Sequence, residues 1–345
     1  MNAAVHSSIL WQTKIFHLPL VAPVVSGELV IVASMGQGTQ GAFGFLDGLE
    51  RRTGAPRWSF HGMEGMGLAG GFLSTPVVAG QLLVFGSRRG ALHCLQARTG
   101  AEIWATRIDR EVCAAPLVAA GQVFFASTDG TLTALALETG AKRWSFKTGH
   151  SIYAAPVVEN DRIAVASWDG HLYALDVDGA LAWDADLAPA QPTALELGAG
   201  RVVMFDSYDG HVRAVGIARD VDRWQATEEW RFPTGGRLDV RPVLADDSVY
   251  VAAPGENEMT CLNIDTGEVR WTSKPGAKLL TPVVDNERLI VASRDGQIVA
   301  LDLRTGIELW RLTTGLTFSC PPALSDDVVY IGGTNRALYA IKTGF

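Results

Sequence analysis

Three side chains in this sequence are suited to moving protons: Asp206, His150 and Tyr153. A carboxylate, an imidazole and a phenol can each act as a general acid or base when placed beside a substrate. Asp206 is selected by comparison within the chain, because the corresponding turns of other segments carry alanine. Those alanines are Ala126, Ala166 and Ala292. The three candidates point to a cofactor-independent enzyme acting on a small molecule, such as a lyase, isomerase or cyclase.

A second set of side chains suits binding rather than catalysis. Arg241 precedes a proline where most comparable segments place a small residue, and Trp168 and Tyr208 occupy equivalent turns. Charged groups beside aromatic walls are suited to a small polar ligand. A structural alternative is that Arg241 pairs with Asp206 or Asp239 to fill the interior, while the aromatic rings cover an apolar rim. The candidate ligand-binding residues are Arg241, Arg237, Asp239, Asp186, Trp168, Tyr208 and Arg110.

Motifs of the common catalytic and metal-binding classes are absent from the sequence. There is no Gly-x-Ser-x-Gly, no His-Glu-x-x-His and no phosphate-binding loop. The four cysteines are isolated and form no Cys-x-x-Cys pair, so no metal or redox site is predicted. We expect them to be buried as small hydrophobic side chains. They are Cys94, Cys113, Cys261 and Cys320.

The charge balance disfavours nucleic acid as a partner. The chain has 29 Lys and Arg against 37 Asp and Glu, a formal net charge of −8, whereas nucleic-acid binding needs a basic surface. The first residues lack the features of a secretory signal and a lipid-attachment cysteine, and no apolar run is long enough to span a bilayer. We therefore expect a cytoplasmic monomer with no membrane contact, unless a leader has been trimmed from the sequence.

The elements that must position these residues are repeated along the whole chain. Tryptophans recur at intervals of roughly forty residues, which indicates a supersecondary unit that needs its neighbours to bury its faces. Many of them follow a glycine turn, as in Thr139-Gly140-Ala-Lys-Arg-Trp144, and a proline opens an apolar stretch in every repeat. The two series are Trp11, Trp58, Trp104, Trp144, Trp183, Trp230, Trp271 and Trp310, and Pro23, Pro76, Pro116, Pro156, Pro192, Pro242, Pro282 and Pro322.

Each repeat is predicted to form four short antiparallel strands. The proline marks the first strand, where no ladder donor is needed, and an Asp-Gly turn such as Asp295-Gly296 joins the second to the third. The tryptophan lies in the fourth strand. Eight such sheets predict an eight-bladed β-propeller, as a single domain over residues 1–345. Residues 9–11 would supply the fourth strand of the last blade and close the ring, since exposed sheet edges are avoided.

The segment Asp295-Gly-Gln-Ile-Val-Ala-Leu-Asp302-Leu-Arg-Thr305-Gly-Ile-Glu-Leu-Trp310 resembles the repeat of pyrroloquinoline-quinone (PQQ)-like propellers, and the resemblance covers nearly the whole chain. It implies that the tryptophan of each blade docks against the neighbouring blade. The family includes quinoprotein dehydrogenases, outer-membrane assembly lipoproteins and kinase sensor domains. The dehydrogenases use an adjacent pair of cysteines beside the quinone, which this chain lacks. We therefore expect no PQQ, no other cofactor and no PQQ-dependent dehydrogenase activity.

Two functions stay open, because a fold of this kind does not name a ligand. We favour a non-catalytic binding or scaffold propeller that engages a protein partner or a small polar ligand on the loop face of the central channel, since every recognisable motif is structural. The alternative is the cofactor-independent enzyme described above. Two segments depart from the repeat: the Gly-rich stretch 61–71, a candidate lid, and residues 217–230, which replace a short turn.

Overall fold

The structure is a computed structural model and consists of β-strands and connecting turns. It describes residues 9–38, 41–61, 75–87, 90–108, 110–112, 114–159, 161–187, 192, 194–198, 201–206, 210–220, 223–236, 240–253, 257–285 and 287–343; only the backbone is described at 37–38, 41–43, 159, 197–198, 201, 205–206, 218–220 and 223–225. In these ranges every regular element is a β-strand. No helix of the described residues is long and apolar enough to cross a membrane.

The chain divides into two compact units of four blades each. Unit 1 comprises residues 1–109 and 275–345, and unit 2 comprises residues 110–274. Each blade is an antiparallel sheet, and blade 1 has a fifth strand. The eight sheets found in the described residues are the blades of an eight-bladed β-propeller, so the predicted fold class is confirmed.

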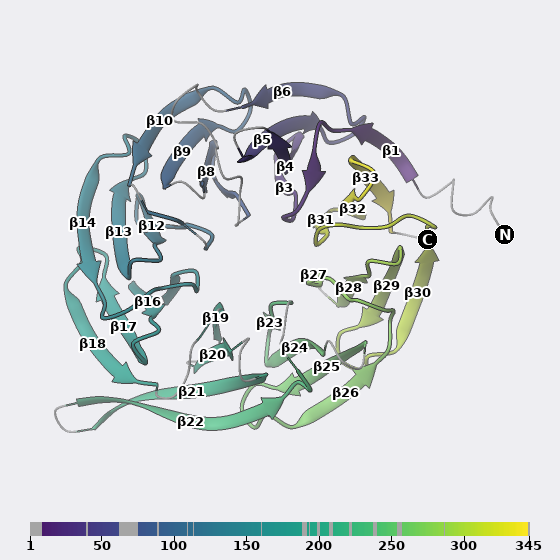
Figure 1. Ribbon diagram of the computed structural model, residues 1–345. Coiled ribbons are helices and arrows are strands. Elements are labelled where there is room, and N and C mark those ends of the chain that lie inside the picture. Colours follow the sequence, from purple (N-terminus) through teal and green to yellow (C-terminus); the bar gives the residue numbers. More distant parts are fainter. Residues whose placement is uncertain are drawn as a thin grey trace. The chain divides into compact units, whose positions relative to one another are not determined.

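Unit 1 contains blades 1, 2, 7 and 8 (Figure 1). Blade 1 is formed by β2 (Leu18–Pro19), β3 (Val24–Ser26), β4 (Leu29–Gly38), β5 (Gly41–Glu50) and β6 (Pro56–Phe60). Blade 2 is formed by β7 (Val77–Ala79), β8 (Leu82–Gly86), β9 (Ala91–Gln96) and β10 (Glu102–Arg107). Blade 7 is formed by β27 (Val283–Asp285), β28 (Arg288–Ala292), β29 (Gln297–Asp302) and β30 (Glu308–Thr313), and blade 8 by β31 (Ala323–Ser325), β32 (Val328–Gly333), β33 (Ala337–Lys342) and β1 (Ile9–Lys14).

Unit 2 contains blades 3 to 6. Blade 3 is formed by β11 (Leu117–Ala119), β12 (Gln122–Ala126), β13 (Thr131–Ala136) and β14 (Lys142–Lys147), and blade 4 by β15 (Val157–Glu159), β16 (Arg162–Ala166), β17 (His171–Asp176) and β18 (Leu181–Asp186). Blade 5 is formed by β19 (Ala194–Gly198), β20 (Arg201–Asp206), β21 (His211–Asp220) and β22 (Arg223–Pro233). Blade 6 is formed by β23 (Val243–Ala245), β24 (Ser248–Ala253), β25 (Glu258–Asn263) and β26 (Val269–Ser273).

The two ends of the chain meet in blade 8. Strand β1 pairs antiparallel with β33, with Ile9 opposite Ile341 and Trp11 opposite Ala340 (Figure 1). The N-terminal segment therefore supplies the outer strand of the last blade, as the repeat pattern predicts. The pairing joins residues at opposite ends of the sequence and leaves β33 without a free edge.

The repeated tryptophan and glycine form an interlock between adjacent blades of a unit. The indole of Trp11 donates a hydrogen bond to the carbonyl of Arg51 at 2.9 Å, and its ring lies against Gly54, where a Cβ would come within 2.5 Å of it. Gly54 also has a φ of +72°, which disfavours other residues. The same indole-to-carbonyl bond joins Trp58 to Ala97, Trp144 to Val177 and Trp230 to Ile264.

Apolar faces of neighbouring blades pack together within each unit. Ile31 and Leu46 of blade 1 share a cluster with Leu83 and Phe85 of blade 2, and comparable clusters join the other neighbours. Among the described cysteines, Cys94, Cys261 and Cys320 are buried and free, as expected for small hydrophobic side chains; Cys113 lies outside the described residues. Burial raises the pKa of the Cys94 thiol to about 11, so that thiol stays protonated.

Two hairpins are longer than their counterparts. In blade 1, β4 and β5 stay paired as far as Gly38 and Gly41, and β2 adds to β4. In blade 5, β21 and β22 stay paired as far as Asp220 and Arg223 (Figure 1). The irregular segment 217–230 is therefore an extended hairpin. The Gly-rich stretch 61–71 lies outside the described residues, apart from His61.

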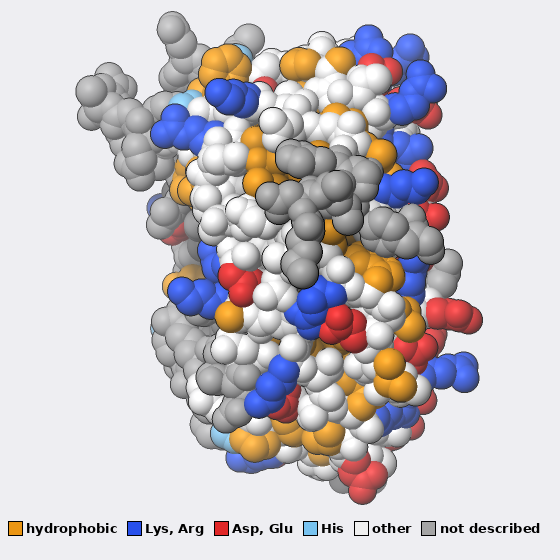
Figure 2. Space-filling model, turned by 90° about the vertical axis from the view of Figure 1, so that its right-hand side faces the viewer, with side chains coloured by type: hydrophobic (Ala, Val, Ile, Leu, Met, Phe, Trp, Pro, Cys, Tyr) orange, Lys and Arg blue, Asp and Glu red, His pale blue; other side chains and the backbone are white. Residues whose placement is uncertain are grey.

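Acidic and basic side chains are interspersed on the face shown in Figure 2, with no continuous stripe of either sign. A mixed surface of this kind does not concentrate a field of one sign.

Candidate functional site

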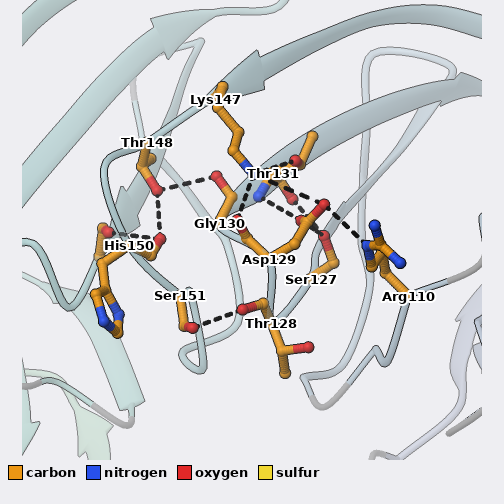
Figure 3. Close-up of polar contacts among 11 residues, drawn as sticks. Arg110, Ser127, Thr128, Asp129, Gly130, Thr131, Lys147, Thr148, His150 and Ser151 are labelled. Atoms are coloured by element: carbon orange, nitrogen blue, oxygen red, sulfur yellow. Dashed lines mark hydrogen bonds and ion pairs between the residues drawn. The ribbon is translucent and has the colours of Figure 1, made fainter.

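The best-defined group of predicted site residues lies on the loops of blades 3 and 4 in unit 2. Its base is the turn between β12 and β13, where Ser127 Oγ donates to Asp129 Oδ1 at 2.6 Å and the Thr131 amide donates to the same oxygen at 3.0 Å (Figure 3). Thr148 Oγ1 lies between two carbonyl oxygens, at 2.9 Å from Gly130 and 2.7 Å from His150. These contacts tie the loop that follows β14 to the turn.

Three aromatic side chains gather on two adjacent loops. The ring centroids of Tyr153 and Trp168 are 4.3 Å apart, and His150 stacks on Trp168 at 6.3 Å. Trp168 Nε1 donates to the Pro192 carbonyl at 3.4 Å, and the Trp168 amide donates to the Ser151 carbonyl at 2.9 Å. His150 is exposed, and Tyr153 and Trp168 are partly exposed. Backbone contacts therefore hold a partly exposed aromatic surface, which we call the blade 4 aromatic cluster (His150, Tyr153 and Trp168).

Charged groups lie around Asp129, in the turn next to the loop that carries His150 (Figure 3). Arg110 Nε lies 3.5 Å from Asp129 Oδ2, and Lys147 Nζ lies 3.7 Å from the same oxygen (Figure 3). Burial raises the pKa of Asp129, but hydrogen bonds from Ser127 and Thr131 and the charge of Lys147 together hold it below its usual range. Arg110 and Lys147 each keep 61% of the side chain exposed. The cationic groups therefore remain accessible to a partner.

The carboxylate of Asp169, which follows Trp168 in the chain, accepts hydrogen bonds on both of its oxygens. Asp169 Oδ2 accepts hydrogen bonds from the Gly149 amide at 2.6 Å and from the Tyr173 hydroxyl at 2.8 Å, and Oδ1 accepts from the His171 amide at 3.0 Å. Burial, followed by the Asp169 carboxylate, raises the pKa of Tyr173. Asp169 thus orders the turn that carries Trp168.

Arg241 has a partner that the sequence analysis missed. Its Nη2 lies 3.0 Å from Glu196 Oε1. Burial raises the pKa of Glu196, and Arg241 opposes the shift. By strand register, Glu196 occupies a position that is aliphatic in every other blade. A comparison of the repeats in the correct register would therefore have identified Glu196 as a departure from the pattern. The aliphatic residues are Val24, Val77, Leu117, Val157, Val243, Val283 and Ala323.

The remaining predicted residues are not drawn into this group by the described contacts. Asp186 ends β18 opposite His171 and is exposed. Asp206 ends β20 opposite His211, but its side chain is not described. Arg237, Asp239 and Tyr208 lie outside the described residues. The proposed acid–base set of Asp206, His150 and Tyr153 therefore stays a prediction.

No metal centre is formed within the described ranges: no three His, Cys, Asp or Glu side chains there are grouped to hold an ion. The blade 4 aromatic cluster offers a partly exposed ring surface, and the partly exposed side chains of Arg110 and Lys147 lie on neighbouring loops, paired with Asp129. Tyr, Trp and Arg are the residues most enriched at the centres of protein interfaces. The arrangement is suited to contact with another protein.

Sequence comparisons point to one family. The PQQ_2 family model, described as "Outer membrane protein assembly factor BamB", matches residues 42–204, 126–227 and 208–344. The chain is similar to serine/threonine-protein kinase AfsK of Streptomyces griseus, with 31% identity over 138 residues, 35% of this chain and 16% of the kinase. It is also similar to outer membrane protein assembly factor BamB of Yersinia pestis, with 27% identity over 182 residues, 48% of this chain and 44% of the relative. The matches thus span less than half of the curated relatives.

Solved structures share the fold along almost the whole chain. BamB from Moraxella catarrhalis aligns with a TM-score of 0.67 and 18% identity, covering 96% of this chain and 98% of that one. A europium-containing methanol dehydrogenase aligns with a TM-score of 0.70 and 14% identity, covering 97% and 93%. At these identities the likeness shows the fold alone.

The expected cytoplasmic location is wrong. The matching family and the Yersinia pestis relative are both named for the assembly of outer membrane proteins. The expectation rested on the first residues of the sequence, which say little about where a folded β-propeller works.

Proposed function

Because the chain belongs to the family described as outer membrane protein assembly factor BamB, we propose that it is a non-catalytic propeller that binds a protein partner during outer membrane protein assembly. We place its work on the periplasmic side of the outer membrane, since that is where proteins destined for this membrane arrive. The propeller serves as a rigid scaffold, and specificity lies in the side chains that depart from the repeat.

The observation that carries the proposal is the blade 4 aromatic cluster. A repeat tryptophan such as Trp144 binds the neighbouring blade of the same unit, through its indole bond to Val177. Trp168 instead lies on a loop, with its ring 4.3 Å from that of Tyr153. Ordered rings lose little side-chain entropy on binding and bury a large area. Arg110 and Lys147, which contact Asp129 on the neighbouring turn, would favour acidic groups on the partner.

Co-purification from solubilised outer membranes tests this proposal. We expect the wild-type chain to retain an outer membrane assembly protein, and the double variant Trp168→Ala with Tyr153→Ala to lose most of it, because removing central interface aromatics costs about 2 kcal/mol or more each. Leu181→Ala is the matched control, since Leu181 is an exposed apolar residue on β18 of the same blade.

The melting temperature of each variant is measured first, so that only variants as stable as the wild-type chain are compared. A folded double variant that retains the assembly protein as well as the Leu181→Ala control does would contradict the assignment of the surface. Retention of no outer membrane assembly protein by the wild-type chain would contradict the function itself.

A further inference from the structure

Asp47 in blade 1 is a buried carboxylate that the fold leaves half satisfied. It is 6% exposed, and on β5 it lies opposite Val32 and Ser59. The Ser59 hydroxyl donates to Oδ1, whereas the buried Oδ2 has no hydrogen-bond partner among the described residues. Leaving one oxygen of a buried carboxylate unpaired is costly.

Two other blades place an ionisable residue at this position and pair it with a carboxylate. In blade 2 the same register position is His93, whose Nδ1 lies 2.8 Å from Glu102 Oε1. In blade 5 it is Arg213, whose Nη1 lies 3.6 Å from Glu228 Oε2. Within the described residues Asp47 forms no ion pair with a lysine or arginine, and only the charges of His17 and His61 act on it. Asp47 Oδ2 therefore keeps its capacity to accept a hydrogen bond.

The aromatic rings of Phe16 and Phe45 lie near Asp47 in blade 1. Phe16 is 68% exposed and stacks on Phe45, with centroids 6.4 Å apart and planes 25° apart. Phe45 also contacts His17 at 4.5 Å and the edge of His61 at 4.8 Å. Burial raises the pKa of Asp47, while the Ser59 hydrogen bond and the charges of His61 and His17 oppose the shift, so both imidazoles are close enough to act on the carboxyl.

The extended hairpin of blade 1 builds this arrangement. Strand β2 pairs with β4 through Leu18 opposite Met35, which brings the preceding His17 onto Gly36. A Cβ at Gly36 would come within 2.5 Å of the His17 ring, so the glycine lets the ring approach the hairpin closely. Phe45, on the paired strand β5, then lies under both Phe16 and His17.

We propose that Asp47, Phe16 and Phe45 form a binding site for a lysine or arginine side chain of a partner protein. The buried Asp47 carboxylate attracts the ammonium or guanidinium group by its charge, and the exposed ring faces contact the cation and its aliphatic stem. The site lies in unit 1 and uses none of the blade 4 aromatic cluster. It relies on the proposed function only in taking the partner to be a protein.

Small cations test the site without knowledge of the partner. The ring C–H signals of His17 and His61 are followed by NMR while n-butylguanidinium or n-butylammonium is added, and His17→Gln and His61→Gln assign the signals. We expect saturable shifts with both cations and none with butan-1-ol. Asp47→Asn is expected to weaken the apparent affinity at least tenfold, and Phe16→Ala at least threefold. Asp326→Asn, a carboxylate in the same unit with 76% of its side chain exposed, serves as the control and should bind as wild type does.

Shifts that fail to saturate, or that are equal in wild type and Asp47→Asn, would overturn the proposal.

The urea midpoint of Asp47→Asn is the second measurement. Because the fold disfavours the Asp47 carboxylate, the variant should be at least as stable as wild type near neutral pH. Its advantage should shrink as the pH falls from the raised pKa of folded Asp47 to the ordinary carboxyl value of 3.8, because the folded wild type takes up the Asp47 proton in that range. A clear loss of stability would show that Asp47 is a structural residue and would overturn the site. Because the probes are free cations, failure of this test would leave the outer membrane function standing.

Discussion

His93 shows how a single side chain can make this fold sensitive to pH. The imidazole is 1% exposed and stacks on Phe85 at 5.2 Å with an interplanar angle of 12°. Its Nδ1 lies 2.8 Å from Glu102 Oε1, and its Nε2 has no hydrogen-bond partner in the described part of the chain. Burial lowers the pKa of His93, and the Glu102 carboxylate opposes the shift. The folded state therefore prefers the neutral ring.

A lowered histidine pKa predicts a loss of stability in mild acid. The unfolded chain takes up the His93 proton near the ordinary value of 6.5, so stability is fully present above that pH and falls below it, until the folded pKa is reached. Each pH unit between the two values costs about 1.4 kcal/mol. We expect His93→Phe, which keeps the ring stack, to reduce the fall in urea midpoint between about pH 8 and pH 5. An unchanged fall would contradict this assignment.

At the scale of the element, the interlock of outer strands and turns carries much of the stability. Trp11 on β1 is buried and donates to the Arg51 carbonyl, while Thr13 Oγ1 donates to the Gly54 carbonyl at 2.7 Å. Blade 8 is thereby latched to blade 1 by the same strand that completes it. Removing the latch also frees the edge of β33.

Trp11→Ala is expected to lower the free energy of unfolding by about 3–5 kcal/mol, the usual cost of truncating a large buried aromatic residue. Leu10→Ala, on the same strand but with the side chain 50% exposed, should change it by less than about 0.5 kcal/mol. Urea unfolding followed by tryptophan fluorescence measures both. Equal midpoints for the two variants would show that the closing strand contributes little.

The elements were largely predictable from the sequence, and the site only in part. The Trp and Pro series predicted the blades and the pairing of β1 with β33, because strand period and turn chemistry are local signals. Glu196 escaped notice because blade 5 places more residues between Pro192 and the aliphatic position than the other blades do, which shifts the alignment of repeats. Asp47 was not predicted as a site residue, because its burial and its unpaired oxygen result from packing in the long β4–β5 hairpin. No short sequence motif reveals the length of that hairpin.

At the scale of the molecule, a regular scaffold carries a few irregular surfaces. The family match covers residues 42–344, and the described blades repeat one hydrogen-bonding plan. Function in such scaffolds lies in departures from the plan. The blade 4 aromatic cluster and the Asp47 site are such departures, in different units.

Site-specific photo-crosslinking in living cells tests the central claim most directly. A photoreactive amino acid replaces Tyr153 in one strain and Leu181 in another, so that both probes lie on blade 4 and only one lies in the aromatic cluster. We expect the probe at 153 to link to a protein of the outer membrane assembly machinery and the probe at 181 to form no such link. Two results would contradict the proposed function: a crosslink from position 181 but not from position 153, or no crosslink to such a protein from position 153 when the protein has reached the outer membrane.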